Sequence, residues 1–203
     1  EKVYCCTVPG QHQFSLTNGV QTAQCSEILL QAIPVDSEHI KGGGWQFCNL
    51  STINCREDDN TLSIYRKAML ATLMGDIQSL ATDFQFLREG TKTICDQERL
   101  LGVNLVGYST CSFIRENPDV VEQIRDYVTH TDRMFALDFN VPNSAALTSV
   151  KPSGNSSVFC YTGPGANPLH GRKMIRNVTV NKNSAMHLFL ESQGVPRHDY
   201  PGR

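Results

Sequence analysis

Apolar runs alternate with long helical patterns through the middle of the chain, and this alternation limits the possible folds more than any other feature. Residues 45–53 and 100–108 are apolar runs that predict strands, and residues 58–81 between them form a helical pattern. A second long helix is predicted to begin at Pro118, before a short apolar run at 144–150. Strands that are separated by long helices pair in parallel through crossover connections. The chain is therefore predicted to be an α/β protein.

The helix predicted within residues 58–81 carries apolar residues at steps of three or four. Either Asp58 or Asn60 can cap its first turn, because both side chains accept hydrogen bonds from backbone N–H groups. Apolar residues at this spacing share one side of a helix. We expect that side to face the core, and its members are Leu62, Tyr65, Met69, Leu73, Ile77 and Leu80.

Shorter elements are predicted toward both ends of the chain. Residues 27–33 and 174–180 are predicted strands, and residues 184–193 are a predicted short helix that stops at Gly194. No internal repeat, low-complexity segment or linker divides the 203 residues. The whole chain, 1–203, is therefore expected to be a single domain.

Composition excludes several classes of function. The formal charge of −2 gives no basic surface for nucleic acid, and no apolar run approaches the roughly 18 residues of a membrane helix. Eight cysteines in 203 residues are too few for a disulfide-stapled secreted scaffold, and none has zinc-site spacing, so no metal site is expected. We expect a reducing cytoplasmic compartment, in which a cysteine motif more often indicates chemistry than stapling.

A thiol and a carboxylate lie two positions apart in "TAQCSEILL", at Cys25 and Glu27. In a strand, residues two apart point the same way, so the two groups would share one face. Cys48, in "FCNLSTIN", brings a second thiol, and two thiols near one carboxylate could serve a redox reaction. The plain alternative is a buried cysteine beside a surface glutamate.

A small polar turn, "KPSGNSS", follows the apolar run that ends at Val150. Glycine and small hydroxyl residues at a strand end leave backbone N–H groups available to an anion, so phosphate binding is one interpretation. The other is an ordinary Pro/Gly/Asn turn.

Six segments occur in order along the chain: "QCSEI", "FCNLSTIN", "NTLSIYRKAMLATLMGDIQSLATDFQFLR", "ERLLGVNLVG", "VPNSAALTSVKPSGNSS" and "MIRNVTV". Together they resemble the catalytic barrel of ribonucleotide reductase large subunits, from Ala23 onward. The resemblance is closest to the adenosylcobalamin-dependent class, including its phage-type members. It implies a ten-stranded α/β barrel with a radical cysteine on an inner finger loop, of which this chain is the C-terminal portion.

The resemblance assigns a role to each residue of the cysteine motif. Cys25 matches the cysteine that becomes a thiyl radical and takes the 3′ hydrogen of the ribose, and Glu27 matches the base toward the 3′-hydroxyl. Cys48 matches the cysteine that reduces the sugar and ends in a disulfide. A thiyl radical is quenched in water, so the site must exclude solvent. The implied substrate-binding residues of the turn are Pro152, Ser153, Gly154, Asn155 and Ser156.

The chain departs from the family pattern in three ways. Ala23 stands at the substrate-binding position where the family has an asparagine that hydrogen-bonds the sugar. The family places the thiol partner of Cys48 on an upstream strand, and no cysteine of these residues matches it. The upstream half-barrel and the allosteric region are also not found in these residues. We therefore expect a complementary reductase chain that carries the upstream cysteine.

The expected function is reduction of ribonucleoside di- or triphosphates to 2′-deoxyribonucleotides for DNA synthesis, in a bacterial or phage-infected cytosol. The resemblance implies adenosylcobalamin as cofactor and thioredoxin or glutaredoxin as reductant. The alternative hypothesis is a non-catalytic remnant or split-subunit module of the same fold, which needs a complementary chain.

Overall fold

The computed structural model divides into two compact units, Glu1–Leu169 and His170–Arg203, which are described separately. The structure describes residues 13–15, 21–23, 30–151, 153, 156–169, 171, 173 and 180–198, with the backbone alone at 13–15, 21–23 and Val158. None of the helices within these ranges is both long and apolar enough to cross a membrane.

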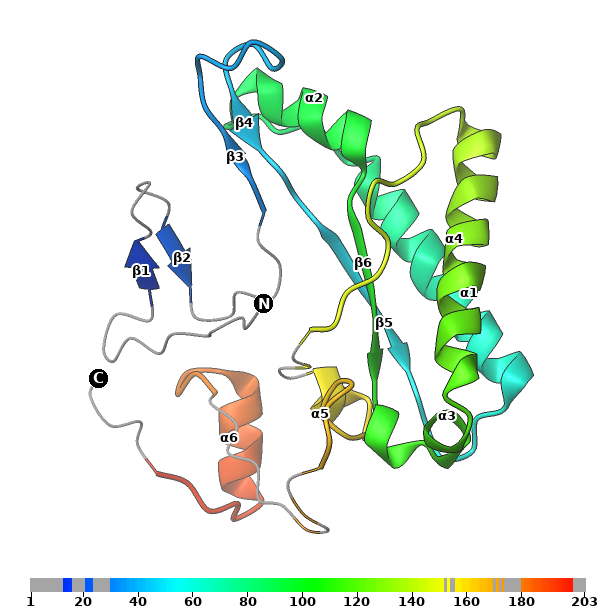
Figure 1. Cartoon of the computed structure of the whole chain (residues 1–203). Helices are drawn as coiled ribbons and strands as arrows, with labels where there is room; N and C mark the ends of the chain where they lie inside the picture. Colours follow the sequence, from blue (N-terminus) through cyan, green and yellow to red (C-terminus); the bar gives the residue numbers. More distant parts are fainter. Residues whose placement is uncertain are drawn as a thin grey trace. The chain divides into compact units, whose positions relative to one another are not determined.

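A parallel pair of strands forms the centre of the first unit. β5 (Asn49–Asn54) and β6 (Leu101–Val106) pair in parallel over all six of their residues. α1 (Thr61–Ser79) follows β5, and α4 (Asp119–Phe139) precedes the next strand-like segment. Both helices lie on the same side of the β5–β6 pair (Figure 1). The predicted α/β arrangement with parallel pairing is confirmed.

Residues 146–149 extend this sheet on the other side of β6. The Val103 N–H donates to the Leu147 carbonyl at 2.9 Å, and the Ser149 N–H donates to the Val103 carbonyl at 3.0 Å. Thr148 is therefore the parallel partner of Val103. The strand predicted at 144–150 is present as this short segment. Within the described ranges the sheets have two named strands each, and no ten-stranded barrel is seen.

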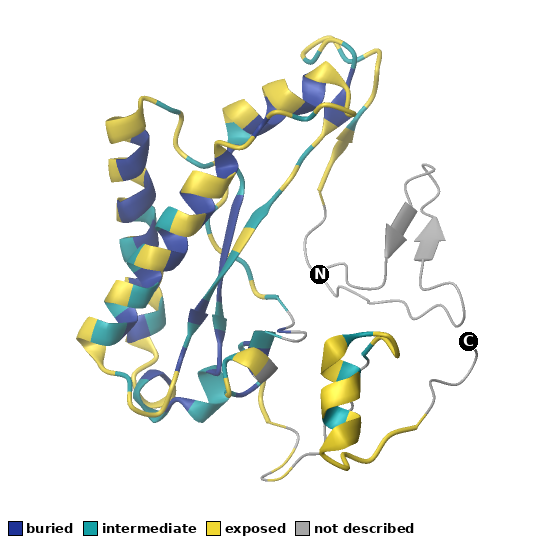
Figure 2. Cartoon of the chain, turned by 180° about the vertical axis from the view of Figure 1, so that it is seen from behind, coloured by how far each residue is buried: buried dark blue, intermediate teal, exposed yellow. Residues whose placement is uncertain are grey.

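The core lies between this sheet and the two helices. Ile53 and Val103 point from the strands into a cluster with α1 and α4, and every member of that cluster is almost completely buried. Figure 2 shows the buried residues concentrated on the inner sides of the two helices. The remaining members are Cys55, Ile64, Ala68, Ala71, Cys111, Ile114, Val120, Ile124 and Val128.

The prediction of which side of α1 faces the core was wrong. Leu62 and Ile77, from the predicted stripe, are each 62 % exposed. The sheet-facing side carries small or polar residues instead, because the helix lies close to β6: a methyl group added to Gly75 would be 3.2 Å from Leu101 Cδ2. The buried residues of α1 are Ile64, Ala68, Ala71, Thr72, Gly75, Asp76 and Ser79.

The predicted helix starts are confirmed. The Ser63 N–H donates to Asn60 Oδ1 at 3.2 Å, and the Asn60 N–H donates to Ser63 Oγ at 3.0 Å, which is a capping box. α4 begins at Asp119, directly after Pro118. Such caps satisfy N–H groups that have no partner within the helix.

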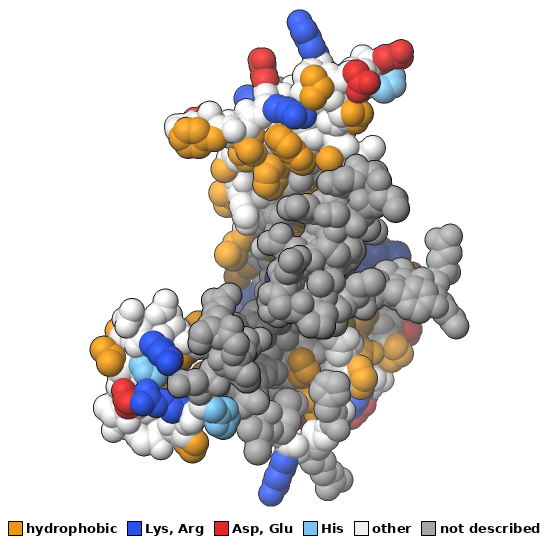
Figure 3. Space-filling model, turned by 90° about the vertical axis from the view of Figure 1, so that its left-hand side faces the viewer, with side chains coloured by type: hydrophobic (Ala, Val, Ile, Leu, Met, Phe, Trp, Pro, Cys, Tyr) orange, Lys and Arg blue, Asp and Glu red, His pale blue; other side chains and the backbone are white. Residues whose placement is uncertain are grey.

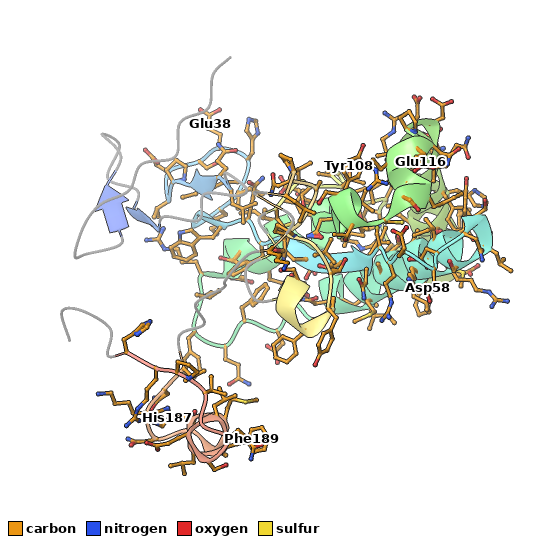
Figure 4. All side chains as sticks on the ribbon, turned by 90° about the horizontal axis from the view of Figure 1, so that it is seen from below. Glu38, Asp58, Tyr108, Glu116, His187 and Phe189 are labelled. Atoms are coloured by element: carbon orange, nitrogen blue, oxygen red, sulfur yellow. The ribbon has the colours of Figure 1, made fainter. Side chains whose placement is uncertain are left out.

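Four helical elements were not predicted. α2 (Glu89–Glu98) is short and contains only two large apolar residues, Ile94 and Cys95, so the sequence gives few repeats from which to predict it. η1 (Tyr108–Thr110) and α3 (Ser112–Glu116) follow β6, and Figure 4 labels Tyr108 and Glu116 on these two elements. α5 (Ser156–Phe159) is a single turn.

The run at 45–53 is not one strand. β4 (Gly44–Trp45) pairs antiparallel with β3 (Ala32–Ile33), and β5 begins only after an irregular stretch at 46–48. Of the strand predicted at 27–33, residues 30–33 are described, and only β3 within them is a strand. β1 (Gln13–Ser15) and β2 (Gln21–Ala23) form a separate antiparallel pair.

A buried ion cluster joins α1, α4 and the residue that ends α2. Arg99 Nη2 lies 2.7 Å from Asp76 Oδ1, and Arg99 Nη1 lies 4.0 Å from Asp132 Oδ1. Arg99 also donates to Ser79 Oγ at 3.1 Å, so its planar guanidinium connects several elements. Burial, followed by the hydrogen bond and charge of Asp132, raises the pKa of Asp76 to about 7, although Arg99 opposes this.

The second unit contains one described helix, α6 (Ala185–Ser192). Its start confirms the prediction, because Ser184 Oγ accepts the His187 N–H at 3.2 Å, and Gly194 follows its end with φ of +67°. His187 and Phe189 project to different sides of this helix (Figure 4). The strand predicted at 174–180 lies outside the described residues except for Val180.

Candidate functional site

The parallel sheet has two faces of different character. Val103 and Leu105 of β6 point toward the helices, so Gly102 and Asn104 between them point to the opposite face. Of the described helices of the first unit, only the single turn α5 lies on this side, where the Asn54 side chain donates to the Cys160 carbonyl at 3.5 Å, and we call this second face the open face (Figure 1). Parallel sheets are usually covered on both faces, and Asn104 on this face is itself buried.

Cys48 lies at the edge of the open face, directly before β5. A methyl group added to Gly102 would lie 3.0 Å from Cys48 Sγ and 3.1 Å from Ser149 Oγ, and would overlap the Leu50 side chain. The thiol and the hydroxyl thus pack closely against the same glycine, and this packing requires a residue without a side chain at position 102. The Cys48 thiol is free and partly exposed.

Two opposing effects act on the Cys48 thiol. Burial is the larger and raises its pKa, while the nearby Lys151 ammonium lowers it. The neutral thiol is therefore favoured at neutral pH, as a donor of hydrogen or of an electron with a proton requires. By contrast, burial and then the neighbouring Cys111 raise the pKa of Cys55 to about 12, which makes it an inert core thiol.

The described part of the predicted phosphate turn is internally bonded. The Ser156 N–H donates to the Ser153 carbonyl at 2.9 Å, and the Ser156 hydroxyl donates to the same oxygen. The Ser153 hydroxyl donates to Ser157 Oγ at 3.0 Å. The Ser156 N–H thus serves the turn itself, so phosphate contacts there must come from other groups.

Several predicted site residues lie outside the described residues. Cys25 and Glu27 are among them, and so are Pro152, Gly154 and Asn155. Ala23 is described as backbone within β2. Of the predicted catalytic residues, the structure therefore places only Cys48, with the Lys151 ammonium near it. The roles of the other residues stay predictions.

Sequence reasoning did not select Gly102, Asn104, Ser149 or Lys151 as site residues. Lys151 belonged to the quoted turn motif, which was the available signal for it. The other three belong to strands that read as plain apolar runs, and only pairing and face reveal that they neighbour Cys48.

Three polar atoms of the open face have no hydrogen-bond partner although they are shut off from solvent: Asn54 Oδ1, Asn104 Oδ1 and Ser149 Oγ. Asn104 is only 3 % exposed. Buried polar atoms are nearly always bonded, and each exception requires an explanation.

An aromatic cavity lies beside the start of β5. The Phe47 and Phe84 rings stack with centroids 5.2 Å apart, and a cavity of about 240 Å³ is bordered by both, by Cys48 and by Cys95. Hydrophobic side chains gather near the β4 and α2 end of the face drawn in Figure 3. Burial raises the pKa of the Cys95 thiol, so it too is a poor nucleophile at neutral pH.

Within the described ranges, no group of three or more His, Cys, Asp or Glu side chains could hold a metal ion. No family model matches the chain, and no curated protein matches it either.

Proposed function

We propose that the chain is the C-terminal portion of a ribonucleotide reductase catalytic barrel, which reduces ribonucleotides to 2′-deoxyribonucleotides. The observation that carries the proposal is the free Cys48 thiol on the open face of a parallel β–α–β unit. A barrel of this kind keeps its helices outside and its chemistry inside, so the open face corresponds to the barrel interior.

The proposed reaction balances with two thiols. Cys48 and a cysteine of a complementary chain become one disulfide and give two electrons and two protons. The 2′-hydroxyl leaves as water, and a hydrogen replaces it on the sugar. Cys25 would take and return the 3′ hydrogen, and Glu27 would hold the 3′-hydroxyl proton. Thioredoxin or glutaredoxin would then reduce the disulfide in the cytosol.

Adenosylcobalamin, when bound, would supply the initial radical. No step is assigned through this group. The substrate is a ribonucleoside di- or triphosphate, with the 152–156 turn as the proposed phosphate contact.

The test is a reconstituted assay with a complementary chain, adenosylcobalamin and a dithiol, in which the 2′-deoxyribonucleotide is quantified by chromatography. Cys25→Ser and Cys48→Ser are each expected to abolish product, because an alcohol replaces neither the hydrogen-transferring thiol nor the disulfide partner. Cys160→Ser is the matched control and should retain product formation. Wild-type turnover by Cys25→Ser would refute the radical assignment.

The alternative proposal is a non-catalytic module of the same fold that works only through a complementary chain. The exposed apolar side of α1 favours association, because Leu70, Met74 and Ile77 are each more than half exposed. Ala23 also lacks the amide of the reductase pattern. If the reconstituted chain is inactive and Ala23→Asn restores turnover, this alternative is supported over an active enzyme.

A further inference from the structure

Two of the unpartnered atoms, Asn104 Oδ1 and Ser149 Oγ, lie on the same face of the sheet as the proposed reducing thiol. Val103 pairs with Thr148, so Asn104 and Ser149 occupy the following rung of the sheet and share the open face. Cys48 Sγ lies beside Gly102, which precedes Asn104 by two residues. Along a strand this separates the thiol from the Asn104 amide by about 7 Å, which a pentose ring can span.

The chemistry of the two groups defines what they can bind. A side-chain amide oxygen accepts hydrogen bonds, and a serine hydroxyl both donates and accepts. Neither atom has a partner in the described part of the protein, and each is closed to solvent. A ligand with adjacent hydroxyl groups would satisfy both, and a buried unpaired polar atom costs about 1–3 kcal/mol until it is satisfied.

We propose that Asn104, with Ser149 beside it, recognises the hydroxyl groups of the substrate ribose and so replaces the amide that Ala23 does not provide. This inference rests on the proposed function, because it takes a ribonucleotide as the ligand. Asn104 is a binding residue in this account, and it orients the sugar next to Cys48 without entering the redox step.

The experiment measures binding of ADP, CDP, GDP and UDP to the full chain by calorimetry, and repeats it with the matching 2′,3′-dideoxyribonucleoside diphosphates. In the wild type, the ribonucleotide is expected to bind more tightly than its dideoxy analogue. Asn104→Ala should weaken ribonucleotide binding about threefold to tenfold, the effect of one hydrogen bond. It should leave the affinity for the dideoxy analogue unchanged.

Ser149→Ala provides a second variant whose small size change preserves folding, and a loss of hydroxyl selectivity is again expected. Ser51→Ala is the matched control. Its hydroxyl is also buried and unpartnered, but it lies on β5 opposite Val103, on the helix-covered face. The affinity of Ser51→Ala for both ribonucleotides and dideoxy analogues should equal that of the wild type.

The outcomes separate this inference from the proposed function. If ribonucleotides bind and both variants retain wild-type selectivity for the ribose hydroxyls, the inference is wrong and the proposed function stands. If Asn104→Ala weakens the ribo and dideoxy forms equally, the amide does not contact the hydroxyls and the inference is again wrong. If no ribonucleotide binds the wild-type chain, this inference fails, and the reconstituted assay with the complementary chain decides the proposed function separately.

Discussion

The helix-covered face and the open face of one small sheet differ in almost every physical respect. On the covered face, Ile53 and Val103 are nearly inaccessible to solvent and contact apolar residues of α1 and α4. On the open face, a thiol and a hydroxyl pack against Gly102, and buried polar atoms have no hydrogen-bond partner. Apolar packing favours a single static arrangement, whereas unpaired polar atoms can still gain hydrogen bonds. We therefore expect substitutions on the two faces to differ in their effect on stability.

The largest expected effect comes from the ion cluster on the covered side. Arg99→Met should lower the free energy of unfolding by about 3–5 kcal/mol, because it leaves two buried carboxyl groups, Asp76 and Asp132, without their cation. Chemical denaturation followed by circular dichroism measures the change. Arg125→Met is the matched control, since Arg125 is exposed and its ion pairs are worth about 0–1 kcal/mol.

Neighbouring residues of β5 provide the sharpest comparison of the two faces. Ile53→Ala should lower the free energy of unfolding by about 2–5 kcal/mol, because it opens a cavity beneath α1. Thr52→Ala, one residue away on the open face, should lower the free energy of unfolding by well under half of that amount. Equal losses in the two variants would contradict the expected difference between the faces.

The free energy of unfolding is expected to depend on pH because of Asp76, on the helix-covered side of the sheet. Its folded-state pKa of about 7 exceeds the unfolded value near 3.9, so the native state holds more protons between these limits. Stability contributed by the protonated form is fully present below about pH 4 and is lost as pH rises toward 7. The slope is at most about 1.4 kcal/mol per pH unit.

Asp76→Asn removes this titration. Relative to the wild type, the variant should therefore become progressively more stable as pH rises from 4 to 7, in denaturation curves at fixed ionic strength. A constant difference between the two proteins over that range would show that Asp76 does not take up a proton on folding.

The smallest effect concerns the open face alone. Lys151→Ala removes the cation that partly offsets the effect of burial on the Cys48 thiol, so the pKa of Cys48 should rise further. The rate of Cys48 alkylation at fixed pH should fall, while global stability changes little. Lys151→Arg retains the charge and should behave like the wild type, and a faster reaction in Lys151→Ala would show that the sign is wrong.

The sequence predicted the elements better than their orientation. The long helices, the cap at Asn60 and the parallel pairing followed from periodicity and capping chemistry. The side of α1 was wrong because close approach to the sheet selects small residues such as Gly75 over the larger apolar stripe. Helix periodicity identifies a side with shared character but does not reveal which side the tertiary structure buries.

The candidate site was predicted only in part. Cys48 was selected from a motif, and the structure places its thiol beside Gly102. Asn104 and Ser149 could not be selected, since their significance arises from pairing between segments more than forty residues apart in sequence. The positions of Cys25 and Glu27 relative to Cys48 stay predictions.

The central claim, that Cys48 faces the substrate on the open face, is tested most directly by competitive alkylation. The chain would be treated with iodoacetamide with and without CDP, and modification of each cysteine followed by mass spectrometry. The account predicts that Cys48 reacts faster than the buried Cys55 and Cys111, and that CDP slows Cys48 alone among these three. Modification of Cys48 at the same rate with and without saturating CDP would contradict the claim.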